Sequence, residues 1–233
     1  MKIMSFNTQH CLNYLEQKID YDIMANTIKT VGADIVGLNE MYSEADVPSD
    51  YINQTKKLSE LTGIENYYFA KAIQLSGEGA YGNGLLSKYK IVEAKTIKIP
   101  DPNPRRCPNG YYETRCVLKA KLENGYTVID CHFGLNPDEQ ENAVKTILEN
   151  LEEEKCILMG DFNVTPEDSV LLPIYEKLKD ASQGFCKHTP TFPSDKPRIK
   201  IDYIFVSPDI TVEYAEIPEI IASDHRVHVA EIK

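Results

Sequence analysis

The sequence of 233 residues lacks any apolar stretch as long as the roughly 18 to 20 residues that a membrane-spanning helix needs. No signal peptide is expected either, because the first residues, Met1-Lys2-Ile3-Met4, lead directly into an expected strand. We therefore expect no transmembrane segment and a cytoplasmic location.

Paired cysteine motifs are also missing. The six cysteines form no Cys-x-x-Cys pair and no cysteine–histidine spacing of a zinc site. Cys116, Cys131 and Cys156 lie in apolar runs, which favours small buried thiols in a reducing compartment. Disulfides or a catalytic thiol are the alternative interpretation.

Positive charge is scarce. The chain has 25 lysines and arginines against 36 acidic residues, with a net charge of −11 and a pI near 5.0. Non-specific binding to nucleic acids depends on clustered basic side chains, so the composition argues against a protein that coats nucleic acids. An enzyme acting on phosphates fits this charge, because a bound divalent cation reverses the local sign at a carboxylate-rich site.

The sequence does contain five short polar clusters spread along its length. Each of them ends or follows an apolar run that is typical of a buried strand, where functional loops commonly begin. The clusters are Ser5-Phe6-Asn7, Leu38-Asn39-Glu40, Gly160-Asp161-Phe162-Asn163, Ile201-Asp202-Tyr203 and Ser223-Asp224-His225. Because groups from both ends of the chain converge only within one cooperative unit, we predict a single domain, residues 1–233.

The hydrophobic pattern alternates between helical and strand-like spacing. Helices are expected at residues 18–31, about 49–61, 137–151 and 168–178. Strands, mostly antiparallel in the middle of the chain, are expected at residues 2–7, 34–38, 67–70, 81–86, 91–99, 113–122, 126–133, 156–159, 199–206, 211–215 and 227–232. This order predicts an α/β fold.

Two acids are candidate metal ligands, Glu40 and Asp224, since each lies just past an apolar run. Mg²⁺ takes oxygen ligands and is usually held by one or two carboxylates, with water and substrate phosphate completing its coordination. For Glu40 taken alone, a surface acid is the alternative interpretation, and the other clusters favour the ligand.

The remaining clusters suit proton transfer and phosphate binding. Asp161 and Asn163 can point into one space, the acid accepting a proton from water and the amide donating to a phosphate oxygen. A turn or a helix cap is the alternative for this pair. Asp202 and His225 suit a carboxylate–imidazole pair that keeps a positive donor available, and His132 is a second such donor.

Two loop regions give weaker signals. The glycines of residues 77–84 lack the Lys-Ser/Thr ending of a P-loop, so we expect them to allow close backbone approach, with Asn83 as a polar lining residue. Residues 100–110 form an expected surface loop, in which Arg105 and Arg106 are candidates for substrate contact.

In order along the chain, the motifs resemble those of the endonuclease/exonuclease/phosphatase superfamily, which includes DNase I, exonuclease III, neutral sphingomyelinases, inositol-polyphosphate phosphatases and deadenylases. The resemblance spans nearly the whole chain and rests on Met4-Ser5-Phe6-Asn7, Leu38-Asn39-Glu40, Tyr81-Gly82-Asn83-Gly84-Leu85-Leu86-Ser87, Glu113-Thr114-Arg115, Cys131-His132-Phe133, Gly160-Asp161-Phe162-Asn163, Ile201-Asp202-Tyr203 and Ser223-Asp224-His225. It implies a four-layer sandwich, in which two mixed, mainly antiparallel sheets pack face to face between helices.

The resemblance also implies residue roles. Glu40 would bind Mg²⁺ or Mn²⁺, with Asn7 and Asp224 supporting the metal centre. Asp161 would align or deprotonate the attacking water, and Asn163 would bind the phosphate.

Three further residues would act on the transition state by the same resemblance. His225, paired with Asp202, and His132 would stabilise it, and Arg115 matches an arginine near the phosphate. The chain departs from the usual pattern in having Leu-Asn-Glu in place of Gln-Glu, and His-Phe-Gly in place of Thr-His-Leu. His132 is closer to the DNase, sphingomyelinase and phosphatase branches than to the apurinic endonucleases.

We therefore predict a Mg²⁺- or Mn²⁺-dependent phosphoester hydrolase that uses in-line attack of water. The expected substrate is a small molecule or lipid head group carrying a phosphoester, because the chain is acidic and compact. A nuclease acting on DNA or RNA is the alternative, and a catalytically inactive binding module is a further one. No protein partner is evident from the sequence.

Overall fold

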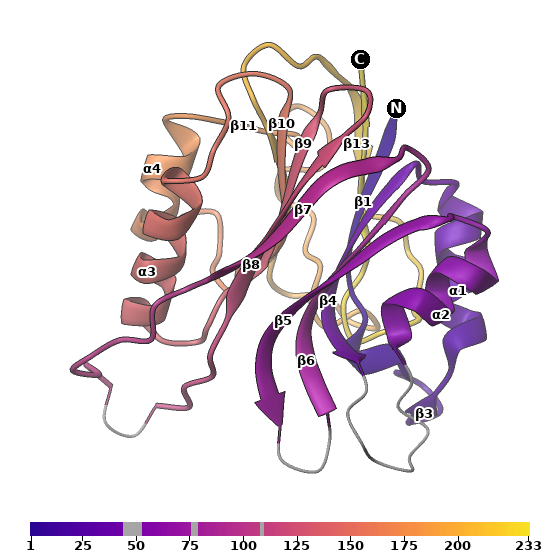
Figure 1. Cartoon of the computed structure of the whole chain (residues 1–233), viewed down its shortest axis with the longest axis horizontal. Coiled ribbons are helices and arrows are strands. Elements are labelled where there is room, and N and C mark those ends of the chain that lie inside the picture. The colour runs from indigo at the N-terminus through magenta and orange to yellow at the C-terminus, as the bar shows by residue number, and fades with distance from the viewer. Residues whose placement is uncertain (44–52, 76–78, 108–109) are drawn as a thin grey trace.

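The computed structural model describes residues 1–43, 53–75, 79–107 and 110–233. Two six-stranded sheets lie face to face, and helices cover the outer face of each sheet (Figure 1). This arrangement confirms the predicted four-layer sandwich.

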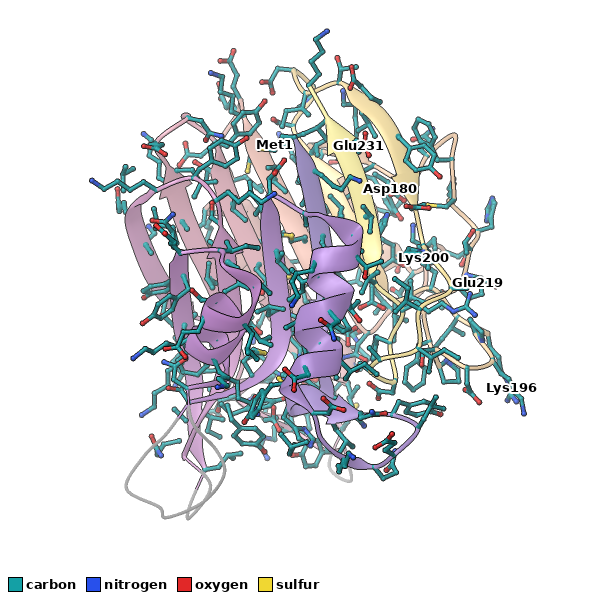
Figure 2. All side chains as sticks on the ribbon, turned by 90° about the vertical axis from the view of Figure 1, so that its right-hand side faces the viewer. Met1, Asp180, Lys196, Lys200, Glu219 and Glu231 are labelled. Atoms are coloured by element: carbon teal, nitrogen blue, oxygen red, sulfur yellow. The ribbon has the colours of Figure 1, made fainter. Side chains whose placement is uncertain are left out.

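The first sheet is built from both ends of the chain. Its strand order is β13 (Val212–Glu216), β14 (His228–Ile232), β1 (Lys2–Asn7), β4 (Ile35–Ser43), β6 (Gly79–Ser87) and β5 (Asn66–Leu75). Only β1 and β4 run parallel among these neighbours. Figure 2 shows Met1 and Glu231 beside each other where the chain begins and ends, because β1 pairs with β14.

The second sheet comes from the middle of the chain. Its strand order is β11 (Lys179–Asp180), β12 (Asp202–Val206), β10 (Cys156–Asp161), β9 (Thr127–His132), β8 (Cys116–Leu122) and β7 (Ile91–Lys98). Here β9 and β10 are the parallel pair, and the other neighbours are antiparallel. Both sheets are therefore mixed and mainly antiparallel, as the sequence predicts.

The helices begin and end at residues suited to those positions. The carboxylate of Asp20 accepts the Ile23 N–H at the start of α1 (Tyr21–Val31), and Gly32 ends this helix in the left-handed conformation. The α2 helix (Gln54–Thr62) is capped in the same way by Asn53 and Gly63. The α3 helix (Pro137–Leu148) begins with proline, whose missing N–H needs no partner there.

Several expected elements differ in extent from those observed, and the strand expected at 199–206 begins only at Asp202. Residues 18–19 form the short strand β3 (Lys18–Ile19), which pairs with β2 (Leu12–Asn13), so the first helix starts later than predicted. Residues 168–178 contain only the 3-10 turn η2 (Ser169–Leu171) and the short α4 helix (Leu172–Tyr175). The strand expected at 113–122 begins at Cys116. Of the helix expected at 49–61, residues 49–52 lie outside the described residues.

Apolar side chains fill three layers. One lies between the sheets and includes Ile35, Leu118 and Ile204. A second lies under α1 and α2, and a third under α3 and α4. All six cysteines are free thiols, as expected. None of the described helices is long and apolar enough to cross a membrane.

Strand register brings the polar clusters to one end of the sandwich. Asn7 lies opposite Asn39 in the first sheet, and Asp161 lies opposite both His132 and Asp202 in the second. Since β1 starts beside the chain termini and ends at Asn7, this end is remote from both termini (Figure 1). The carboxyl ends of parallel strands are a common place for functional sites in α/β folds.

The backbone at Gly160 is expected to tolerate no side chain. Its φ is +140°, and an added Cβ would lie 1.9 Å from the Cys131 carbonyl oxygen of the neighbouring strand. Gly160→Ala should therefore destabilise the protein by about 3 kcal/mol or more, which lowers Tm by roughly 6 to 12 °C. Gly63→Ala is the matched control, because Gly63 also has positive φ but open space around it, so only about 1 to 2 kcal/mol is expected. Equal Tm values for the two variants would contradict this account.

Candidate active site

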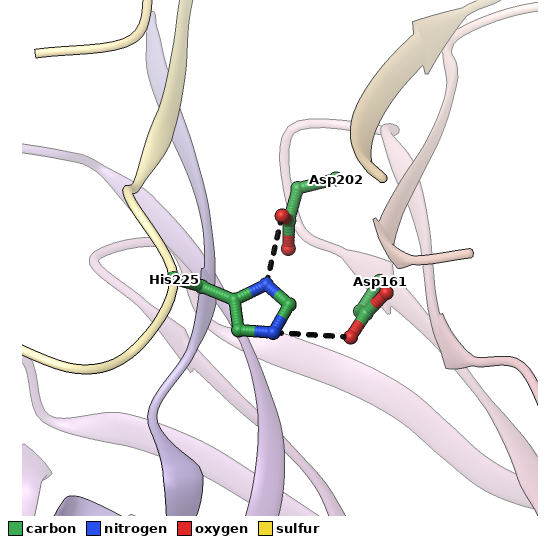
Figure 3. A group of neighbouring side chains, drawn as sticks. All are labelled: Asp161, Asp202 and His225. Atoms are coloured by element: carbon green, nitrogen blue, oxygen red, sulfur yellow. Dashed lines mark hydrogen bonds and ion pairs between the residues drawn. The ribbon is translucent and has the colours of Figure 1, made fainter. Parts of the chain in front are cut away.

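The carboxylate of Asp161 is the centre of the candidate site. Asp161 ends β10 and is only 1% exposed. Its Oδ2 atom accepts a hydrogen bond from Asn7 Nδ2 at 3.0 Å and lies 3.5 Å from His132 Nε2 and 3.7 Å from His225 Nε2. Its Oδ1 atom accepts the Asn163 N–H at 2.9 Å. Groups from both sheets therefore converge on one carboxyl group, and Figure 3 shows His225 directed toward it.

The environment of Asp161 shifts its titration toward neutral pH. Burial raises the pKa of Asp161 to about 7, and the positive charge of His225 opposes this rise. An acid with a pKa in this range exchanges a proton readily near neutral pH, which is the property of a general base.

His225 is held as a cation by the acids around it. Its Nδ1 donates to Asp202 Oδ2 at 2.9 Å, which leaves Nε2 directed at Asp161 (Figure 3). Burial alone would lower the pKa of His225, but the charges of Asp202 and Asp161 outweigh it and raise the pKa to about 10. His225 is therefore protonated at neutral pH.

His132, in contrast to His225, is neutral. Arg115 Nη1 donates to His132 Nδ1 at 3.1 Å, so the proton of the neutral ring must lie on Nε2, which faces Asp161. Burial, followed by the charges of Arg115 and His225, lowers the pKa of His132 well below its usual value. The short distance between His132 and Asp161 is therefore a contact of a neutral N–H with a carboxyl group and not an ion pair.

Arg115 is buried among charged and aromatic groups. It forms an ion pair with Glu113 at 2.7 Å, and its guanidinium lies 5.9 Å from the centre of the Tyr81 ring. Burial raises the pKa of Tyr81, and the nearby charge of Glu40 adds to this rise. Tyr81 is thus close to both the candidate metal ligand and Arg115, a role that the sequence analysis did not identify.

Glu40 reaches the site through a local irregularity of β4. The pairing of β4 with β6 shifts register between Leu38 and Met41, and Glu40 has a φ of +60°. A bulge of this kind redirects a side chain that regular strand geometry would place elsewhere. The Glu40 Oε1 atom accepts a hydrogen bond from Asn7 Nδ2 at 3.1 Å.

The carboxylates of Glu40 and Asp224 fit a hard divalent cation. Burial raises the pKa of Glu40 and the negative charge of Asp224 raises it further, so the two acids repel each other without a cation between them. Carboxylate oxygens are preferred ligands of Mg²⁺. Asn7 is a weaker candidate ligand, because its Nδ2 donates to Glu40 and Asp161 while its Oδ1 already accepts the Gln9 N–H.

Another acidic group has the spacing of a metal site. Ligand atoms of Asp161, Asp202 and His225 lie within 4.8 Å of one another. A direct hydrogen bond already joins His225 to Asp202, however, so this set resembles a carboxylate–imidazole pair facing a second carboxyl group. Glu40 and Asp224 are the better candidate ligands.

The other predicted substrate contacts lie in different surroundings. Asn163 has a φ of +51°, and its Nδ2 donates one hydrogen to the Phe133 carbonyl, which leaves the second available. Asn83 is 2% exposed, and its amide is bound to Asn39 and to the Cys116 carbonyl. These contacts support a structural role for Asn83 inside the sandwich rather than the predicted lining role.

Arg105 and Arg106 are engaged by neighbouring residues. The guanidinium of Arg105 lies over the Tyr112 ring at 4.5 Å, and Arg106 forms an ion pair with Glu141 of α3 at 2.8 Å. In the described part of the chain, no hydrogen bond or ion pair joins either arginine to Asp161 or to the two site histidines. Arg115 is the arginine that the fold brings to the site.

Buried polar residues near the site escaped the sequence analysis. Asp130 lies within β9, two residues before His132, and Lys200, two residues before Asp202 in the sequence, forms a buried ion pair with Asp180 at 3.4 Å. Figure 2 shows Lys200 and Asp180 together beside the C-terminal strand, where His228 is also buried. The sequence does contain a sign of such residues, because a charged residue inside an apolar run breaks the expected hydrophobic pattern.

The charge state of His225 depends on Asp202. Asp202→Asn removes the negative charge that opposes the effect of burial on His225, so the pKa of His225 should fall by roughly one to three pH units. NMR titration of the imidazole in metal-free protein measures this change. Asp22→Asn, at an exposed position of α1, is the control and should leave it unchanged. Folding raises the pKa of His225, so the protonated ring contributes fully to the free energy of unfolding below about pH 6.5, and this contribution is lost as the pH rises through about 10. Asp202→Asn should therefore also reduce the loss of stability at alkaline pH. An unchanged titration would contradict the assignment.

Comparison with known proteins identifies the family. The sequence profile of the Endonuclease/Exonuclease/phosphatase family matches residues 4–225. No curated protein sequence matches the chain. A solved endonuclease/exonuclease/phosphatase from Beutenbergia cavernae superposes with a TM-score of 0.84 at 20% identity, over 100% of this chain and 71% of that one. A Bacteroides thetaiotaomicron mannosyl-6-phosphatase gives 0.78 at 17% identity, over 100% and 99%. A humanized D. rerio TDP2 gives 0.63 at 15%, over 100% and 98%. The chain therefore belongs to the endonuclease/exonuclease/phosphatase family, whose members are phosphoesterases and nucleases.

Proposed function

We propose that this protein is a Mg²⁺- or Mn²⁺-dependent phosphoester hydrolase in which water attacks phosphorus in line with the leaving group. The observation that carries the proposal is the convergence of three N–H groups, from Asn7, His132 and His225, on the buried Asp161 carboxyl group. Beside them stand two acids, Glu40 and Asp224, that repel each other unless a cation neutralises them.

Asp161 aligns the attacking water and accepts its proton. A pKa of about 7 allows the carboxylate to be available near neutral pH and still basic enough to take a proton. The Asn163 N–H holds Oδ1, so the orientation of the carboxyl group is fixed before substrate binds. A base that needs no reorientation lowers the entropic barrier of the attack.

The two histidines and Asn163 stabilise the charge that grows on the phosphate oxygens. His225 contributes a cationic N–H, and His132 contributes a neutral one. The second hydrogen of Asn163 Nδ2 is available for a phosphate oxygen. Such donors are effective because the surrounding protein already holds them in place in a site with little water.

Glu40 and Asp224 hold the divalent cation, and Asn7 fixes the Glu40 carboxylate by donating to its Oε1. The bound cation supplies charge neutralisation at the phosphoryl oxygens and thereby makes phosphorus more electrophilic. Removal of divalent cations should abolish turnover, because the two acids then lie near the phosphate without compensation.

The substrate is a small phosphorylated molecule or a phosphorylated head group. The chain carries a net charge of −11, and Arg106 and Arg226 near the loops are paired with Glu141 and Glu219 within the protein. A nucleic-acid surface needs free basic side chains to replace counterions. The Bacteroides relative is a mannosyl-6-phosphatase, which is a precedent in this fold for a small phosphomonoester.

The reaction is tested with a panel of phosphomonoesters and phosphodiesters in the presence of Mg²⁺ or Mn²⁺. Asp161→Asn should lower kcat by roughly 10²- to 10⁴-fold, because it removes the base and leaves the shape of the site. Glu40→Gln should increase the metal concentration that gives half-maximal activity by about 10-fold or more. Glu167→Gln, an exposed acid in the same loop region, is the control. Absence of product from every substrate, or full activity of Asp161→Asn, would refute the proposal.

The substrate class is tested by salt dependence. If the substrate is small, binding to a single-stranded oligonucleotide at 50 mM salt should be weak, and hydrolysis of a small phosphoester should change little between 50 and 200 mM salt. A nuclease would instead bind the oligonucleotide and lose about 300-fold or more of its affinity over this range if it used six or more phosphate contacts. That second result would move the assignment to a nucleic-acid substrate.

A further inference from the structure

Asn39 joins the two sheets at the level of the candidate site. It lies on β4 in the first sheet, but its side chain is bonded to the second sheet. Its Oδ1 accepts the Asp161 N–H at 2.9 Å, and its Nδ2 donates toward Asp130 Oδ2 at 3.0 Å and the Cys131 carbonyl at 3.1 Å. One amide therefore holds the backbone of Asp161 from across the core.

The backbone of Asn39 is also held in place, directly before Glu40. The Asn39 carbonyl accepts hydrogen bonds from the backbone N–H and the hydroxyl of Thr8, both at 3.2 Å. Glu40 follows directly in its left-handed conformation within the bulge. Asn39 is thus fixed on both sides, and Glu40 and Asp161 are tied to one residue.

Asp130 is one of the partners that together fix the orientation of the Asn39 amide. It is fully buried in β9, and its Oδ2 accepts from Asn39. At the other end of the amide, Asn39 Oδ1 faces the N–H of Asp161. A flipped amide would therefore place its NH2 group against this N–H and its oxygen against the oxygen of Asp130. Gly37 contributes by having no side chain, because a Cβ there would lie 2.4 Å from Asp130 Oδ1.

The surroundings of Asp130 suit a neutral carboxyl group. In the described part of the chain its Oδ1 has no hydrogen-bond partner, and Asn39 is the one side chain that donates to it. Cys116 of β8 and Cys131 of its own strand are the titratable groups beside it, and burial raises the pKa of both thiols. Burial likewise raises the pKa of Asp130 well above its usual value, with only Asn39 opposing. A charge here would lack the partners that buried charges require.

We propose that Asn39 and Asp130 form a positioning pair that holds Asp161 and Glu40 in a fixed relation across the space between the sheets. Asp130 acts as an uncharged hydrogen-bonding group, and Asn39 transmits the constraint to both site residues. Neither residue touches the substrate. The kinetic consequence of the pair rests on the proposed hydrolase function, whereas its effect on stability does not.

Asn39→Asp tests the kinetic consequence, because it keeps the shape and replaces the donor Nδ2 with an oxygen that faces the oxygens of Asp130, Cys131 and Asn83. We expect kcat to fall about 10- to 100-fold, the metal concentration for half-maximal activity to rise, and KM to stay within about threefold. The double variant Asn39→Asp with Asp130→Asn restores a donor facing an acceptor and should recover much of the lost kcat. Ser5→Ala is the control, since it removes a buried hydroxyl group opposite Gly37 that, among the described residues, forms no hydrogen bond with either member of the pair.

The stability of the same variants tests the pair without any substrate. Asn39→Asp should lower Tm by roughly 5 to 10 °C, and the double variant should recover most of this loss.

Asp130→Asn should change how the free energy of unfolding depends on pH. Since folding raises the pKa of this acid, the folded protein keeps a proton that the unfolded chain releases above about pH 4, so wild-type stability falls with rising pH. Asp130→Asn should lack this fall.

Each outcome decides the proposal. Recovery of Tm and kcat in the double variant, together with the flatter pH dependence of Asp130→Asn, would support it. A folded Asn39→Asp variant with wild-type kcat would overturn it, as would a double variant no more stable than Asn39→Asp, or a pH dependence of Asp130→Asn identical to that of the wild type. If the wild type hydrolyses nothing, the hydrolase function fails, while the Tm and pH results still decide whether the pair exists.

Discussion

The site depends on one constraint, the burial of an ionisable carboxyl group between two apolar sheets. A carboxylate removed from water is strongly unfavourable unless donors replace the lost solvent. Asp161 receives these donors from both sheets: Asn7 comes from β1, and His132 and the Asn163 N–H come from the second sheet. No single sheet supplies the full set. The face-to-face sandwich is therefore what allows Asp161 to exist as an ionisable group with a pKa near neutrality.

The same constraint explains the irregular backbone at the site. Glu40 and Asn163 are non-glycine residues with positive φ, and Gly160 adopts a φ that only glycine tolerates. Regular strand geometry directs successive side chains to opposite faces, so it cannot bring neighbouring residues into one space. The bulge at Glu40 and the turn after Asp161 break this alternation where the site needs it. Such strain persists because the surrounding hydrogen bonds hold each residue in place.

The sequence was sufficient for the order of the elements and for the motifs at strand ends, because apolar periodicity and short polar clusters are local signals. Strand register then decides which motifs meet, and register is not local: Asp161 faces His132 and Asp202 through pairings with two different strands. The start of α1 was missed because Lys18 and Ile19 pair with Leu12 and Asn13 in a short local hairpin, and the helix begins only after its Asp20 cap. Asp130 was missed, and the hydrogen bonds that Asn83 makes inside the sandwich were not foreseen, because the partners of a buried polar group are known only from the structure.

The two histidines show how partners outside the site set its charge. Both are buried and both direct Nε2 at the same oxygen of Asp161, so their own positions do not explain their difference. The outer partner explains it. Asp202 accepts a hydrogen bond from Nδ1–H of His225 and stabilises the cation, whereas Arg115 donates a hydrogen bond to Nδ1 of His132 and so keeps that ring neutral. Two cations beside Arg115 would crowd positive charge in a medium that screens it poorly. In the proposed reaction, one cationic and one neutral histidine would offer the phosphate two N–H donors while only one positive charge is buried, and Asp202 already balances that charge.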